Sequence, residues 1–345
     1  MKKNLLLLGI LLALGIIIYF ILNRSHTSTL ANEPLTEFAI EDTATVTKLF
    51  IADHVGNTIK LERQPNSKLW KLNDKYLARE DAVNLILDMI RRISVRGSVP
   101  ESGRDNMMKM MASSGKKLEI YTGEDTPAKI YYIGTNTPDH MGTIMLLEIP
   151  ELGRSKDPYI CHIEGFTGFL NPRIFTSEME WRYTGIFEYP ELQFKSVKVE
   201  HLAMPDQSFE MSYGGNNIIG IKGCRPNGQC DLAFTQIDSI GIKDYLLLYK
   251  KVHVESYNTY LKPAAADSIK RQVPVHRITV VDNNNQSHSV SIYPKRAKAP
   301  VPDANGVLTE WDPEYFWIVT EKGEMAMGQK YTFDPLLMPL SKFAR

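Results

Sequence analysis

The chain has 345 residues, in which 40 lysines and arginines balance 40 aspartates and glutamates. With zero net charge, the chain lacks the excess of cations that is typical of nucleic-acid-binding proteins. A content of 10% aromatic residues excludes a mostly disordered chain. Three cysteines are too few for a disulfide-built scaffold or a four-ligand zinc site, and the length allows about two domains.

The first predicted element is a transmembrane helix from Leu5 to Leu22. This run is uncharged and follows Lys2 and Lys3. As a helix it would extend roughly 27 Å, close to the hydrocarbon thickness of a bilayer. The alternative is a cleaved signal peptide, whose apolar region is normally shorter, about 7–15 residues, so we favour an uncleaved anchor. The two lysines predict that residues 1–4 form a cytoplasmic stub and that the rest of the chain lies outside the cytoplasm.

Residues 23–44 are predicted to link the anchor to the folded body. The segment is polar and contains Pro34 and the acidic pair Glu41-Asp42, which is typical of a tether. The short apolar patch at residues 38–40 offers the alternative that part of this segment docks on the body.

The body is predicted to begin with an α+β unit over residues 45–190. Apolar residues alternate on both sides of Gly56-Asn57, which indicates a β-hairpin. A helix is expected to open at Arg79, with apolar residues at three-and-four spacing through Ile93, and to stop at Gly97 and Pro100. Further strands are expected at 70–73, 117–121, 129–133, 143–148 and 159–163.

The second unit, 191–345, is predicted to repeat the same order of elements. A helix is expected at 244–258, and the Pro-rich segment 295–312 is expected to be a long surface loop. The unit boundary is placed near Tyr189-Pro190. Strands are expected around 197–199 and at 209–213, 277–281, 289–293, 315–320 and 325–327. Six matched elements predict an internal duplication of about 145 residues, built from antiparallel strands and hairpins with one main amphipathic helix in each unit.

Several stretches carry a resemblance to a known family. The sequence resembles the membrane-anchored domain-of-unknown-function family 4340 of Bacteroidetes-type bacteria. The resemblance implies a single-span inner-membrane protein with a periplasmic duplicated domain, related to accessory components of gliding-type ABC transporter systems. The family defines no catalytic residues. The matching stretches are 38–43, the hairpin leading to Trp70-Lys71-Leu72-Asn73, 78–82, 142–148, 163–170 and Trp181-Arg182.

The cysteines predict one disulfide and no catalytic pair. Cys224 and Cys230 flank a Pro-Asn-Gly turn, and outside the cytoplasm they are expected to form a local disulfide, with two reduced thiols as the alternative. Cys161 and His162 are neighbours on a predicted strand, so their side chains point to opposite faces and cannot easily form a nucleophile–base pair.

No catalytic, cofactor-binding or metal-binding residues are predicted. The sequence contains no HExxH spacing, no GxSxG elbow and no phosphate loop with GK[ST]. Gly214 to Asn217 and Asp282 to Asn285 are interpreted as turns. The remaining candidates are partner contacts, namely Met107, Met108, Met110 and Met111, and also Pro300, Pro302 and Trp311. For the methionines, core filling with partial exposure competes with partner docking and with copper binding.

These features predict a non-enzymatic, membrane-anchored interaction protein of the cell envelope. Its expected partners are an envelope protein and the lipid bilayer, which the N-terminal helix would enter. The alternative is a ligand-binding accessory subunit of an ABC-type transporter. It predicts an aromatic pocket between the units, drawn from Trp181, Tyr183, Trp311 and Trp317. An enzyme is the third hypothesis.

Overall fold

The computed structural model describes residues 35–344 except 66, 215–218, 258–259 and 304–305, so the span predicted at Leu5 to Leu22 lies outside the described residues. Within the described part, no helix is long and apolar enough to cross a membrane. The chain divides into two compact units between Tyr183 and Thr184. The division precedes Tyr189-Pro190 because β11 (Gly185–Phe187) pairs with β16 (Val252–His253) inside the second unit.

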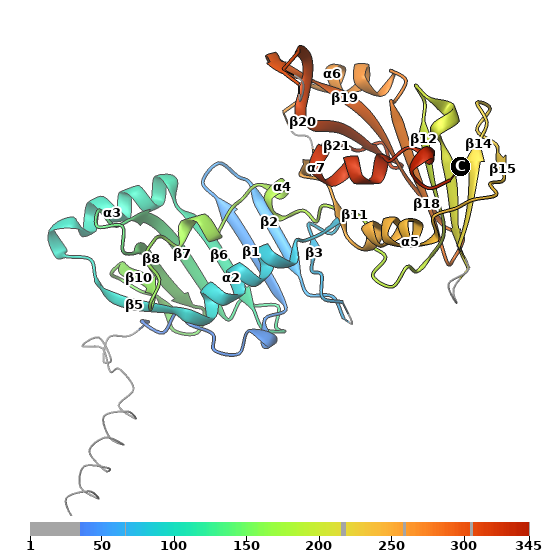
Figure 1. The fold of residues 1–345 in the computed structure, drawn as a ribbon. Coiled ribbons are helices and arrows are strands. Elements are labelled where there is room, and N and C mark those ends of the chain that lie inside the picture. Colours follow the sequence, from blue (N-terminus) through green and yellow to red (C-terminus); the bar gives the residue numbers. More distant parts are fainter. Residues whose placement is uncertain (1–34, 66, 215–218, 258–259, 304–305, 345) are drawn as a thin grey trace, which may run out of the picture. The chain divides into compact units, whose positions relative to one another are not determined.

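Unit 1 contains one antiparallel sheet with the strand order β4-β3-β2-β1-β6-β7-β8-β10-β5, and β9 pairs with β8. Helix α2 (Glu80–Arg92) lies across the sheet in Figure 1, and α3 (Glu101–Ser114) packs against β7. The strands are β1 Lys48–Asp53, β2 Thr58–Glu62, β3 Lys71–Leu72, β4 Tyr76–Leu77, β5 Ile93–Ser98, β6 Lys116–Tyr121, β7 Lys129–Asn136, β8 Thr143–Ile149, β9 Gly153–Arg154 and β10 Tyr159–Ile163; the short helices are η1 Thr43–Thr45, η2 Asn171–Arg173 and α4 Glu178–Trp181.

Local sequence explains the first half of this unit. The β1–β2 turn uses Gly56 at φ 92°, a conformation that glycine adopts without steric cost, and Asp53 accepts the backbone N–H of Asn57. Helix α2 buries the apolar stripe that the sequence predicts, but it ends at Arg92. The prediction that it continues to Gly97 is wrong, because Ile93 instead begins β5 and pairs with Ile163 of β10.

Residues 35–40, here called the N-terminal strap, pack into the core of unit 1. Phe38 is only 1% exposed and lies against the rings of Tyr131 and Tyr159. The Tyr131 hydroxyl donates to the Phe38 carbonyl, and Lys129 Nζ donates to the Ala39 carbonyl at 2.7 Å. The second half of the predicted 23–44 linker therefore belongs to the folded unit, as the docking alternative proposed.

Unit 2 contains a second antiparallel sheet, with the order β15-β14-β13-β12-β18-β19-β20-β21-β17, and the small β11–β16 pair. The strands are β12 Phe194–His201, β13 Phe209–Tyr213, β14 Ile219–Cys224, β15 Cys230–Leu232, β17 Ser256–Tyr257, β18 His276–Asp282, β19 Ser287–Pro302, β20 Leu308–Thr320 and β21 Met325–Gln329; the helical elements are η3 Pro205–Gln207, α5 Ser239–Leu247, η4 Leu248–Lys250, α6 Pro263–Lys270, α7 Lys330–Phe333, η5 Asp334–Leu337 and η6 Leu340–Lys342.

The predicted helix at 244–258 is displaced along the chain. The Asp238 side chain accepts from the Gly241 N–H, so α5 begins at Ser239, before the predicted start. The helical path ends at Lys250 because Val252 and His253 form β16. Tyr245 and Tyr249 are buried against the sheet, and their hydroxyls lie 2.9 Å apart. Of the predicted apolar face, Tyr245 and Tyr249 are buried, but Leu248 is exposed and Val252 lies in β16, and both predicted helix ends are wrong.

The two sheets share one strand order. In each, the first strand (β1 or β12) lies inside the sheet, and the chain then proceeds outward to one edge through three antiparallel neighbours. After a helix (α2 or α5), a strand at the opposite edge follows (β5 or β17), and after a second helix (α3 or α6) the remaining strands fill the space between them. The class is mixed α+β, with mostly antiparallel sheets and few helices, as the sequence predicts.

Residues 295–303 and 306–312 belong to a β-hairpin arm instead of the predicted loop. Strand β18 pairs with β19 only as far as Ile292, and β21 pairs with β20 only from Tyr315 onward. Beyond these points β19 and β20 continue as a two-stranded ribbon, with Pro302 opposite Leu308 (Figure 1). The prolines suggested a loop, but an edge strand tolerates proline where no N–H is needed for pairing.

Candidate binding groove

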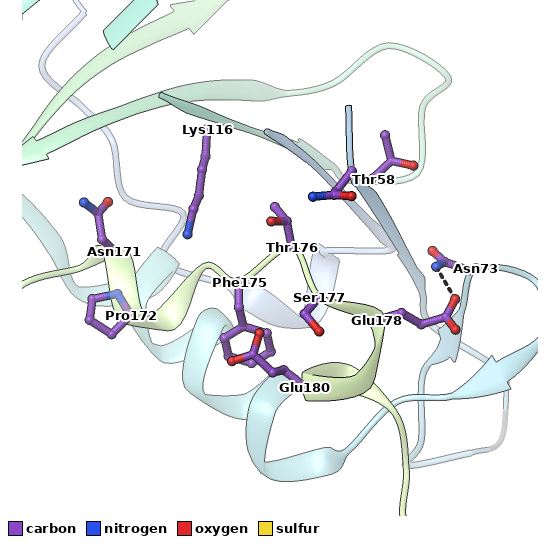
Figure 2. Close-up of a pocket in the computed structure, with 11 residues that line it drawn as sticks. Thr58, Asn73, Lys116, Asn171, Pro172, Phe175, Thr176, Ser177, Glu178 and Glu180 are labelled. Carbon is purple, nitrogen blue, oxygen red and sulfur yellow. Dashed lines mark hydrogen bonds between the residues drawn. The ribbon is translucent and has the colours of Figure 1, made fainter. Parts of the chain in front are cut away.

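Unit 1 contains an open groove of about 810 Å³. One wall is the groove segment, residues 171–180, which follows the last strand of the unit. The other wall comes from the β1–β2 turn, the β3–β4 turn and the start of β6 (Figure 2). The lining residues are Asn57, Thr58, Asn73, Lys116, Asn171, Pro172, Phe175, Thr176, Ser177, Glu178 and Glu180.

Side-chain hydrogen bonds hold the groove segment at both ends. The Asn171 amide donates to the Gly134 carbonyl at 2.9 Å, and the Thr176 hydroxyl donates to Asp53 Oδ2 at 2.7 Å. The buried Trp181 indole donates to the Phe175 carbonyl at 2.9 Å. The wall is therefore fixed before any ligand arrives.

Lys116 contributes the one cation among the groove-lining residues. Its side chain extends from β6 into the groove (Figure 2), and Nζ donates to the Ile174 carbonyl. Burial lowers the pKa of Lys116, and the nearby carboxylates of Glu180 and Asp53 partly oppose that effect. Half-buried and bonded to a neutral carbonyl, the ammonium retains donors for a ligand.

Carboxylates and amides complete the lining. The Asn73 amide donates to Glu178 Oε2 at 2.8 Å, while its own oxygen accepts the Lys60 N–H. Burial raises the pKa of Asp53, but hydrogen bonds from Thr176 and Asn57 outweigh it and lower this pKa to about 2. Two carboxylates and one ammonium line the groove, surrounded by neutral polar groups. This chemistry suits recognition of a polar molecule.

The predicted partner contacts lie on two separate elements. The four methionines belong to α3, where Met110 is exposed, Met107 contacts the Thr135 hydroxyl, and Met111 lies against Gly134. None of the residues of α3 is buried, so the methionines lie partly exposed against β7 and do not fill the core, and their docking to a partner stays a prediction. Pro300, Pro302 and Trp311 lie together on the hairpin arm, all exposed.

Cys224 and Cys230 are joined by a disulfide with an S–S distance of 2.02 Å, and they face each other across β14 and β15. Cys161 is a buried free thiol, and burial raises its pKa. In the part of the chain described by the structure, no three His, Cys, Asp or Glu side chains are placed to hold a metal ion.

Two of the four aromatic residues proposed to line a ligand pocket, Trp181 and Trp317, are buried within their own units, and Tyr183 is partly exposed. Trp181 is fully buried in the core of unit 1, and Trp317 is 6% exposed beneath α6 in unit 2. Trp311 is exposed on the hairpin arm, where Arg296 lies over its ring at 5.6 Å.

Two histidines that appear isolated in the sequence meet in unit 2. His201 ends β12 and His276 begins β18, and the strand register brings their Nδ1 atoms to 3.0 Å. His201 Nε2 faces the Met338 carbonyl at 3.3 Å, and since a carbonyl only accepts, Nε2 carries the proton. His201 Nδ1 is then the acceptor of the His276 Nδ1–H. A proton added at His201 Nδ1 would set two N–H groups against each other.

The histidine pair predicts an acid-sensitive unit 2. Burial and then the neighbouring His201 lower the pKa of His276 to about 4, below its unfolded value of about 6.5. Between these pH values the unfolded chain binds more protons, so stability is full above pH 6.5 and falls by about 2–3 kcal/mol as the pH approaches 4.

This prediction is checked by using hydrogen exchange to measure the unfolding free energy of unit 2 between pH 7.5 and 4. His276→Gln is expected to flatten the dependence, whereas the exposed His54→Gln in unit 1 serves as the control. An unchanged pH slope in His276→Gln would contradict it.

No protein-family model, curated protein or solved structure matches the chain. The groove was not predicted from the sequence, because Lys116 and the groove segment lie far apart along the chain. One signal was present: Asn171-Pro172 recurs as Asp334-Pro335 at the corresponding place in unit 2, after the last strand.

Proposed function

We propose that this chain is a non-enzymatic, single-span inner-membrane protein of the cell envelope that binds an envelope protein through its hairpin arm. Leu5 to Leu22 would anchor it, with the N-terminus cytoplasmic and both units periplasmic. The resemblance to the domain-of-unknown-function family 4340 supports an accessory role in a transport, secretion or gliding-type system.

The observation that carries this proposal is the exposed apolar tip of the arm. Val307 is 62% exposed, Leu308 71% and Trp311 39%, on a ribbon that extends past the neighbouring strands. Exposed apolar side chains on a projecting hairpin are typical of a protein-contact surface.

The arm is suited to docking by side chains and not by strand addition. Pro294, Pro300 and Pro302 remove backbone donors from the β19 edge, and Arg296 and Lys298 place charges along it. The partner would therefore receive the apolar tip in a pocket of its own.

The position of the strap favours a short tether. Because residues 35–40 pack in unit 1, the predicted linker has only residues 23–34 outside it, which reach at most about 40 Å when fully extended. Unit 1 would then stay within this distance of the bilayer.

We also infer that the two units arose by duplication. The shared strand order, the corresponding helices and the Asn-Pro and Asp-Pro motifs after the last strands support this inference. The arm has no counterpart of similar length in the described part of unit 1, where β7 ends at Asn136 and β8 begins at Thr143. The copies would thus have acquired different surfaces.

Co-purification of the full chain from native membranes tests the proposed contact. A double variant, Val307→Asp with Leu308→Asp, is expected to reduce recovery of a stoichiometric envelope partner at least about tenfold, because it charges the apolar tip. Ile240→Asp is the matched control, since Ile240 is 77% exposed elsewhere in unit 2. Equal recovery by both variants, or no stoichiometric partner for the unaltered chain, would overturn the proposal.

A further inference from the structure

We propose that the groove of unit 1 binds a neutral polyhydroxylated ligand, that is, a saccharide. This inference is independent of the hairpin arm, because the groove lies wholly in unit 1 and the arm belongs to unit 2.

The first argument is the hydrogen-bonding character of the lining. Six of the eleven lining residues carry an amide or a hydroxyl, groups that both donate and accept hydrogen bonds. A sugar hydroxyl likewise has one donor and two acceptor positions, so it can either donate a hydrogen bond to these side chains or accept one from them. The six residues are Asn57, Thr58, Asn73, Asn171, Thr176 and Ser177.

The second argument is the distribution of charge. A phosphate or carboxylate attracted by Lys116 would also face Glu178 and Glu180, and a cation attracted by these carboxylates would face the Lys116 ammonium. Like charges brought together in a binding site are costly. A neutral ligand avoids both penalties and still uses the charged groups as strong hydrogen-bond partners: its hydroxyls accept from Lys116 and donate to the glutamates.

The third argument is the fixed form of the site. The bonds from Asn171 to Gly134, from Thr176 to Asp53 and from Asn73 to Glu178 hold the two walls in register. A wall that is already ordered loses little conformational entropy on binding, which matters for a hydrophilic ligand that gains little from leaving water. The groove is open to solvent, so a chain of sugar rings could extend beyond it.

Within the groove, Phe175 adds an apolar surface. Its ring packs on Trp181 with centroids 4.4 Å apart, and it remains half-buried beside Ser177 and Glu180 (Figure 2). An aromatic ring among amides and carboxylates matches a sugar, which presents C–H groups on its ring faces and hydroxyls at its rim.

Saturation-transfer-difference NMR on the full chain in lipid nanodiscs tests the proposal, with no glycoside detergent present. The probes are maltotriose and triacetylchitotriose as neutral saccharides, methyl phosphate as an anion, spermidine as a cation and diglycine as a zwitterion. Transfer to at least one trisaccharide is expected, with affinity reduced at least about tenfold by Lys116→Met, since the variant removes a charged donor. Thr58→Val, at the exposed β1–β2 turn, is expected to weaken binding less.

Lys117→Met is the matched control, because Lys117 is the next residue of β6, points to the other face and pairs with Glu119 at 2.7 Å. Hydrogen exchange of unit 1 verifies that each variant is folded. Transfer to methyl phosphate, spermidine or diglycine with both trisaccharides silent would overturn the proposal in favour of a charged ligand. If Lys116→Met and Thr58→Val both leave trisaccharide binding unchanged, the saccharide does not bind in this groove and the proposal is overturned. If Lys116→Met fails to fold, Thr58→Val alone decides the second outcome.

Discussion

Replacement of Phe38 by alanine is expected to lower the unfolding free energy of unit 1 by about 3–5 kcal/mol. The side chain is 1% exposed and lies against Tyr131 and Tyr159, so its removal leaves a cavity within the main core. The loss should also weaken the strap contacts, because the Phe38 and Ala39 carbonyls accept from Tyr131 and Lys129.

Hydrogen exchange measured by mass spectrometry on the full chain in nanodiscs separates the two units. Phe38→Ala should accelerate exchange across unit 1 while unit 2 stays unchanged as an internal reference. Phe166→Ala, at a position 37% exposed in the same unit, is the matched control and should cost less than about 1 kcal/mol. Equal effects of the two substitutions would show that the strap does not belong to the core.

Replacement of Trp181 by alanine is expected to have an effect of similar size, about 3–5 kcal/mol on unit 1, and in addition to abolish ligand binding in the groove. Trp181 is fully buried, stacks on Phe175 and donates to the Phe175 carbonyl, so its loss frees the groove segment. Its own carbonyl accepts the Arg79 N–H at the start of α2, which couples the segment to the helix.

The same exchange experiment measures this effect. Trp311→Ala is the matched control, because this tryptophan is 39% exposed on the hairpin arm; it should leave the stability of unit 1 unchanged. Trp181→Phe should restore part of the stability but not the indole hydrogen bond. Protection of the groove segment that is equal in Trp181→Ala and the unaltered chain would contradict the assigned role of Trp181.

The elements predicted best are those that short-range patterns encode. The β1–β2 hairpin follows from alternation around Gly56, and the strands β6, β7, β8 and β10 follow from their own apolar periodicity. The start of α2 follows from its amphipathic spacing. Errors occur where neighbouring strands decide the conformation. Ile93 satisfies the helical pattern but pairs in β5, and the prolines of the arm suggested a loop where β19 and β20 pair with each other.

The candidate site was less predictable than the fold. Its walls come from the groove segment, two turns and the start of β6, and no sequence motif links them. The histidine pair shows the same limit, because His201 and His276 become neighbours only through the register of β12 and β18.

Short-range patterns in the chain specify the apolar run from Leu5 to Leu22, the mixed α+β class, the positions of the tight turns and most strands, and the pairing partners Cys224 and Cys230. These features depend on residues close together in the chain, where side-chain periodicity and turn chemistry act directly. Tertiary structure alone decided that the strap enters the core, that the Pro-rich segment is an arm, and that Lys116 faces the groove segment. Such contacts join distant residues, and their geometry depends on which strands become neighbours. The alternation of apolar and polar side chains along one strand does not specify its neighbours.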